Sequence, residues 1–182
     1  MRRVLPWLLL LGGWTAVVAD PLPVLSPASR VRAERVQRWR SALDAAESAR
    51  TADRPAEAKA IYRELLAEAD ADAPPPPAML LARAVDGLAD VERVAGSLAE
   101  AATLYERALP LWRRVLGPDQ PRVATTLQNL AMVRLELGDT AQAAAALREA
   151  LAIWDGWSDA PAAEVGAARA LLDRIEARTV SE

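Results

Sequence analysis

The chain has 182 residues, of which 52% are hydrophobic and 26% charged, and its formal net charge is −3. The near balance of 22 basic and 25 acidic side chains argues against a nucleic-acid-binding protein, which usually presents a strongly basic face. Cysteine and histidine are both absent, which excludes disulfides, thiolate chemistry, histidine-based proton transfer and ordinary zinc sites.

The N-terminal segment has the features of an export signal. Two arginines precede an apolar stretch from Val4 to Val18, and Ala19 offers a small residue for cleavage before Asp20. The alternative is an uncleaved membrane anchor, but the stretch is short for a span of about 20 residues and Pro6 interrupts it. The sequence therefore predicts a signal peptide over 1–19 and an exported, periplasmic chain with no stable membrane anchor after cleavage.

Beyond the signal, prolines predict an extended linker over 20–30, and helical patterns fill the remainder, 31–182. Apolar residues three and four apart predict a first helix over 31–51 and a second helix that starts at Pro55. Four consecutive prolines at 74–77 end the second helix, because proline cannot continue a helix.

Five further helices are predicted after the proline run. Glycine-containing turns separate most of them, since glycine suits a helix end and proline suits the first helical turn. Asp119 is expected to cap the fifth helix. The seven helices form three pairs and one closing helix. The predicted ranges of the five helices after the proline run are about 77–94, 98–116, from Pro121 to the turn at Gly138, 140–155 and 162–178.

A repeat links the later helices. The segment Ala108–Trp112 returns as Ala150–Trp154, with Ala, Leu and Trp at matching places. A fixed period of about 42 residues indicates a solenoid, in which each unit buries its apolar face only against its neighbours. The sequence therefore predicts an all-α solenoid with Trp112 and Trp154 in the core between repeats.

Three stretches make the pattern more specific: Leu104–Leu109, Leu116–Pro121 and Val123–Ala131. Over about 96–157 the sequence closely resembles the 42-residue tetratricopeptide repeats of the kinesin light chain type. The resemblance implies that 31–182 is a tetratricopeptide-repeat domain, with antiparallel helix pairs wound into a right-handed superhelix whose concave face binds a peptide or a partner protein. It also places Tyr62, Tyr105 and Leu147 in the gap between one pair and the next.

The resemblance further assigns polar first-helix residues to the concave face. Asn129 matches the position at which peptide-binding members use an Asn to hold the ligand backbone, because an amide both donates and accepts. Asp44 and Gly87 stand at the equivalent positions, so a repeated Asn clamp is not expected. The implied binding residues are Arg83, Asp86, Asp90, Arg93, Thr125, Gln128, Asn129, Met132 and Glu136, with Arg40, Glu47 and Arg50 in the first repeat.

These features predict a non-catalytic interaction module, an adaptor or assembly factor that binds a protein segment. No glycine-rich phosphate loop occurs, and no serine has a histidine to activate it, so we expect no catalytic residue, no cofactor and no metal. An alternative is a structural subunit that self-associates within an envelope assembly. An enzyme that works by carboxylates alone is the least favoured hypothesis.

Overall fold

The computed structural model describes residues 26–71 and 75–179, and every regular element within them is an α-helix. The predicted signal peptide and most of the predicted linker lie outside the described residues. No helix in the described part is both long and apolar enough to cross a membrane. The helices are α1 (Pro27–Thr51), α2 (Pro55–Asp70), α3 (Ala78–Val94), α4 (Leu98–Leu116), α5 (Pro121–Glu136), α6 (Thr140–Asp155) and α7 (Ala162–Thr179).

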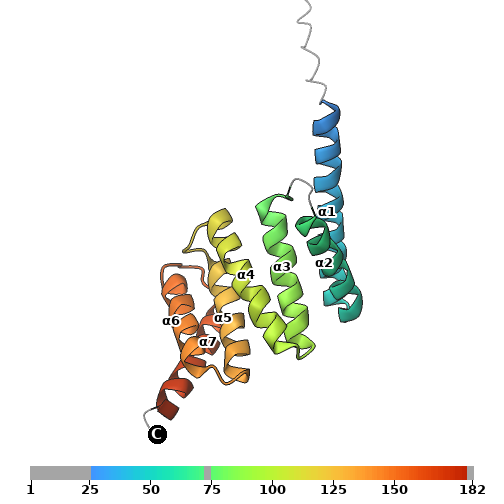
Figure 1. Cartoon of the computed structure of the whole chain (residues 1–182). Helices are drawn as coiled ribbons and strands as arrows, with labels where there is room; N and C mark the ends of the chain where they lie inside the picture. The colour runs from blue at the N-terminus through green and yellow to red at the C-terminus, as the bar shows by residue number, and fades with distance from the viewer. Residues whose placement is uncertain (1–25, 72–74, 180–182) are drawn as a thin grey trace, which may run out of the picture.

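Neighbouring helices in the chain are neighbours in space. Each of α1, α3 and α5 packs against the helix that follows it, the pairs stack in sequence order, and α7 packs on α6 (Figure 1). The all-α solenoid of three helix pairs and a closing helix is therefore confirmed. The order of packing also follows the solenoid rule that each unit contacts only its neighbours.

One predicted helix start and one predicted helix cap were wrong. The linker was expected to extend to residue 30, but α1 begins at Pro27, because proline suits the first helical turn and the Ser26 hydroxyl caps it by accepting from the Ser29 N–H at 3.2 Å. Asp119 was expected to cap α5, but Gln120 is the residue before the helix and no side chain caps it. Pro121 at the first position removes one of the N–H groups that a cap would satisfy.

The turn inside each helix pair has one geometry. Asp53, Gly96 and Gly138 all have positive φ, of 55°, 79° and 89°. In all three turns, the residue after the one with positive φ donates its N–H to the carbonyl of the residue five positions before itself, at 2.8 or 2.9 Å. These turns recur at the repeat period to within a single position, so the first pair follows the same plan as the other two.

The core combines large side chains with many alanines. Trp112 and Trp154 are buried, as predicted, and the side chains at the three gap positions are also buried. Tyr62 lies directly against Gly87 of the next pair: a β-carbon there would stand 2.5 Å from the Tyr62 ring. Gly87 therefore makes room for the tyrosine, which explains why this position of the second repeat carries no side chain.

Ion pairs join each repeat to the next at one recurring position. Each pair links a second helix to the first helix that follows, and successive first-helix partners lie one repeat period apart. The charge of the first-helix partner alternates in sign from one junction to the next. If a second helix packed one whole repeat out of place, like charges would therefore meet. The pairs are Arg63 with Glu92 at 3.0 Å, Glu106 with Arg134, and Arg148 with Glu176 at 2.7 Å.

Helix α7 carries an exposed charged side chain at a position where the earlier first helices carry a buried alanine. Ala89 and Ala131, which are fully buried in α3 and α5, are followed one repeat period later by the exposed Asp173. Arg169 nearby pairs with Asp155 at 3.3 Å. A terminal unit with a polar outer face is what a helical stack needs at its end.

Candidate protein-binding face

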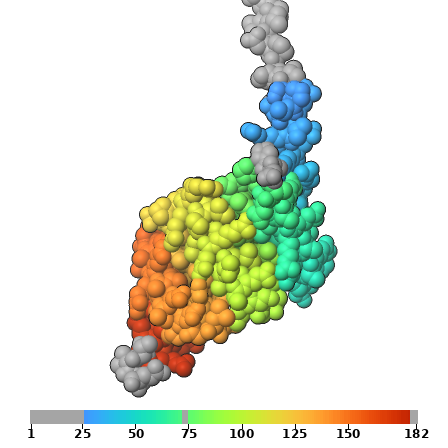
Figure 2. Space-filling model, in the orientation of Figure 1, coloured from blue at the N-terminus to red at the C-terminus, as the bar shows by residue number. Residues whose placement is uncertain are grey.

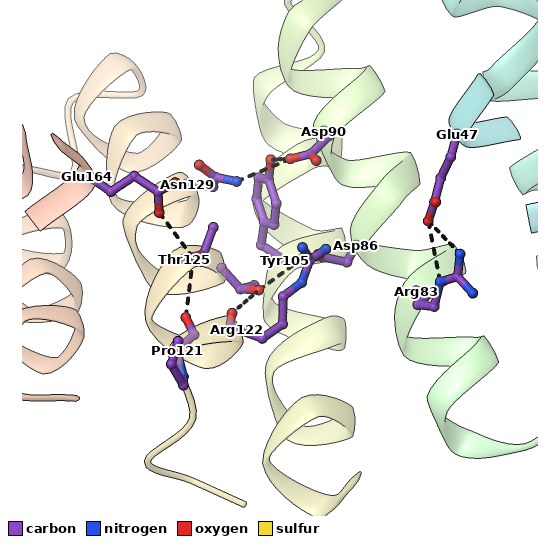
Figure 3. A network of polar contacts seen from close by, with 11 residues as sticks. Glu47, Arg83, Asp86, Asp90, Tyr105, Pro121, Arg122, Thr125, Asn129 and Glu164 are labelled. Atoms are coloured by element: carbon purple, nitrogen blue, oxygen red, sulfur yellow. Dashed lines mark hydrogen bonds and ion pairs between the residues drawn. The ribbon is translucent and has the colours of Figure 1, made fainter. Parts of the chain in front are cut away.

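The side chains that the sequence assigned to binding lie on the first helices, α1, α3 and α5. We call the surface that these helices share with α7 the first-helix face. Figure 3 shows that polar side chains bridge it from α1 to α7. Most of these contacts join residues 36–40 positions apart, a little less than one repeat, so each connects neighbouring units.

Arg83 holds α3 to α1. Its guanidinium donates from Nη2 to Glu47 Oε1 at 2.9 Å and to Asp44 Oδ1 at 3.3 Å. Hydrogen bonds to these carboxylates, with Glu47 the stronger partner, raise the pKa of Arg83 against the opposing effect of burial. Arg83 and Glu47 therefore satisfy each other across the first junction of the face.

Asp86 connects α3 to α5 and is only 3% exposed. Its carboxylate pairs with Arg122 and accepts from the Thr126 hydroxyl at 3.1 Å. Burial raises the pKa of Asp86, and the positive charge of Arg122 opposes that shift. Arg122 also lies over the ring of Trp112, 5.2 Å from its centroid, a distance suited to a cation–π contact.

Asp90 is the second carboxylate of α3 on this face, one helical turn after Asp86. Its Oδ1 accepts from the Tyr105 hydroxyl at 2.6 Å and from the Asn129 amide at 3.2 Å (Figure 3). Burial, followed by the Asp90 charge, raises the pKa of Tyr105. Asp90 therefore fixes the orientation of the Asn129 amide through its nitrogen. The Asn129 amide oxygen remains able to accept a further hydrogen bond.

The last junction of the face joins α5 to the start of α7. Gln128 donates to the backbone carbonyl of Glu164 at 3.3 Å, and the Thr125 hydroxyl lies 3.4 Å from the Glu164 carboxylate. The closing helix thus takes the place that a fourth first helix would occupy. Its residues belong to the face.

The structure brings together six of the nine predicted residues: Arg83, Asp86, Asp90, Thr125, Gln128 and Asn129 all bond across the face. The other three side chains take no part in these bonds. Arg93 is half-buried, with its charge near Tyr105, while Met132 is half-buried and Glu136 is exposed. In the first repeat Glu47 joins the network, whereas Arg40 and Arg50 are exposed.

Sequence reasoning missed residues at both ends of these bonds. Arg122, which pairs with Asp86, and Glu164, which accepts from Gln128, were not predicted. In both cases the two partners are 36 positions apart, and this shared separation could have identified them from the sequence. Sequence reasoning also missed a hollow between α5 and α7, because α7 was treated only as a cap. Arg174 and Arg178 border this hollow, one repeat period after Met132 and Glu136. The hollow is lined by Leu135, Gly138, Thr140, Leu171, Arg174, Ile175 and Arg178.

The face offers fixed hydrogen-bond donors and acceptors, which are suited to binding. Within the described ranges no group of three or more acidic side chains is placed to hold a metal ion. Stacked helix pairs at a fixed period, with polar first-helix residues bonded across one face, define an α-helical repeat protein.

The chain contains tetratricopeptide repeats. Residues 80–155 match the tetratricopeptide-repeat family model. Such repeats generally bind protein partners and are generally non-catalytic, so the fold is that of a protein-interaction module.

Two solved structures share this fold. BtubC (BKLC) from P. vanneervenii is 22% identical with a TM-score of 0.62, and the match covers 82% of this chain and 65% of that one. PcrH from Pseudomonas aeruginosa is 18% identical with a TM-score of 0.57, covering 77% of this chain and 92% of that one. The present chain thus spans about two thirds of the length of BtubC. No curated protein matches the sequence.

Proposed function

We propose that this chain is an exported, non-catalytic adaptor or assembly factor that binds a segment of a partner protein on the first-helix face. The observation that carries the proposal is the bonding between neighbouring first helices. It holds Arg83, Asp86 and Asn129 in place before any partner arrives. A face ordered in advance loses less conformational freedom on binding, which favours affinity.

The groups left for a partner are of mixed character. Glu136 is exposed, Met132 presents part of an apolar side chain, and Arg40 is an exposed cation on α1. The hollow beside α7 adds Arg174 and Arg178 next to apolar side chains. This mixture suits a segment that carries apolar anchors and charges of both signs.

Self-association finds no comparable support. Arginines border the hollows at both ends of the stack, with Arg32 and Arg38 at the N-terminal end and Arg174 and Arg178 at the C-terminal end. Head-to-tail contact between copies would bring these like charges together, which disfavours the contact.

The proposal is tested by isolating the tagged full chain from the cells that make it. The intact mass should show a mature chain that begins at Asp20, and quantitative mass spectrometry should identify a co-purifying protein. Combining Met132→Ala with Glu136→Ala should reduce its recovery about tenfold, the effect of losing contacts worth about 1.4 kcal/mol. Helicity by circular dichroism should be unchanged.

The matched control combines Thr103→Ala with Ala145→Ser, at exposed positions of the second helices α4 and α6. It should recover the partner as the original chain does. Equal loss in both variants, or in neither, would contradict the assignment to the first-helix face. A chain that retains residues 1–19 would contradict export with cleavage.

A further inference from the structure

Helix α1 extends well past the helix that covers it. It has 25 residues, whereas its partner α2 has 16. Figures 1 and 2 show the N-terminal part of α1, in blue, standing out from the body of the stack. Val31 on this part is 65% exposed, although the same helix is packed at Trp39 and Leu43.

A groove lies beside this projecting part and continues the α1–α2 interface. Its volume is about 960 Å³. One wall is α1, and the other is formed by the end of α2 and the prolines before α3. The apolar lining consists of Ala28, Val31, Val36, Trp39, Ala71, Pro75, Pro76 and Pro77.

At the closed end of the groove, arginines of α1 bind a carboxylate, which shows the kind of group that this side of α1 binds. Glu68, near the end of α2, takes a hydrogen bond from Arg35 Nε at 2.6 Å and one from Arg38 Nη2 at 2.9 Å. Together these bonds lower the pKa of Glu68, although burial acts in the opposite direction. A carboxylate on a packed helix is thus bound here by arginines spaced three positions apart.

Arg32 continues this row of arginines along the groove. It lies three positions before Arg35, lines the groove, and forms no ion pair within residues 26–71 and 75–179. Beyond the end of α2, the groove therefore has an apolar floor and a cation that no carboxylate of the described residues pairs with. Among the described residues, no carboxylate takes beside Arg32 the place that Glu68 takes beside Arg35.

We propose that this groove is a second interaction surface, which binds an acidic amphipathic segment of a partner protein. The segment lies along α1 beyond the end of α2. Its apolar side chains cover Val31 and Val36, and a carboxylate pairs with Arg32 as Glu68 pairs with Arg35. Continuity with the α1–α2 interface and the complementary charge identify the occupant. The surface lies at the end of the stack and does not depend on the first-helix face.

The test uses a fluorescein-labelled peptide with the local sequence of α2. The probe is three copies of Glu-Leu-Leu-Ala-Glu-Ala, which is the order of residues 64–69, and the comparison peptide has glutamine in place of each glutamate. Fluorescence anisotropy of the full chain should show saturable binding of the acidic peptide. The glutamine peptide should bind about tenfold more weakly, a difference of about 1.4 kcal/mol.

Arg32→Glu should weaken binding of the acidic peptide by at least about tenfold. Arg114→Glu is the matched control, because Arg114 is an exposed arginine of α4 far from the groove in sequence; it should change the affinity less than about twofold. Equal effects of the two variants, or equal affinity for the two peptides, would overturn the proposal. So would binding to phosphatidylglycerol vesicles in place of the peptide, or a dimer in sedimentation equilibrium that Arg32→Glu dissociates.

Discussion

Replacing Lys59 with methionine is expected to lower the free energy of unfolding by about 2–3 kcal/mol. The reason is the carboxylate of Glu92, which is fully buried and pairs with Lys59 at 2.7 Å and with Arg63 at 3.0 Å. Removing one cation leaves a buried charge partly unpaired, and such a loss costs far more than the loss of an exposed ion pair. Urea unfolding followed by tryptophan fluorescence measures the effect.

A second substitution distinguishes this explanation from a loss of packing. Adding Glu92→Met to Lys59→Met should recover most of the stability, because a buried ion pair can be replaced by apolar side chains at little cost. Arg63 then keeps its bond to Glu100, at 2.9 Å. Arg107→Met, which breaks only an exposed pair with Asp70, is the control and should cost less than about 1 kcal/mol. A double variant less stable than Lys59→Met alone would contradict the account.

The second large effect is expected at Gly87. Gly87→Ala should destabilise the chain by about 3 kcal/mol, because the new methyl group would stand 2.5 Å from the Tyr62 ring. Tyr62 is only 1% exposed and is held by the surrounding core, so the ring has little room to move. The measurement is again the free energy of unfolding in urea.

The sign of this effect should reverse when the ring is removed. In a Tyr62→Leu chain, Gly87→Ala should stabilise by up to about 1 kcal/mol, since alanine is the better helix former and the clash is gone. Leucine is a fitting replacement because Leu147 is buried at the matching place in the third repeat. If Gly87→Ala costs the same in both backgrounds, the close contact between helices is not the cause.

The fold was largely predictable because the signals that specify it are local. The 3.6-residue periodicity and the Gly and Pro turns located α3, α4 and α6 to within about a residue. The same signals did not locate the start of α1, because Pro27 is equally compatible with a linker and with a first helical turn. Whether Ser26 caps a helix is decided by a bond to Ser29 that forms only in the folded chain.

The sequence indicated which residues lie on the candidate face, but much less clearly which residues they bond to. The register that the family resemblance supplies assigned Arg83, Asp86 and Asn129 to one face. It does not show that Asp86 meets Arg122, since that pairing depends on how one repeat is placed against the next. The ion pairs between repeats were missed for a related reason. Their positions recur at the repeat period while their charges alternate, so a comparison of residue identities does not detect them.

The central claim is that partner proteins bind on the first-helix face, and photo-crosslinking in the producing cells tests it most directly. A benzoylphenylalanine at Glu136, which is exposed on α5, is compared with one at Ala145, exposed on α6. The account predicts a crosslinked protein adduct from position 136 and none from position 145. An adduct from position 145 alone, or equal adducts from both, would contradict it.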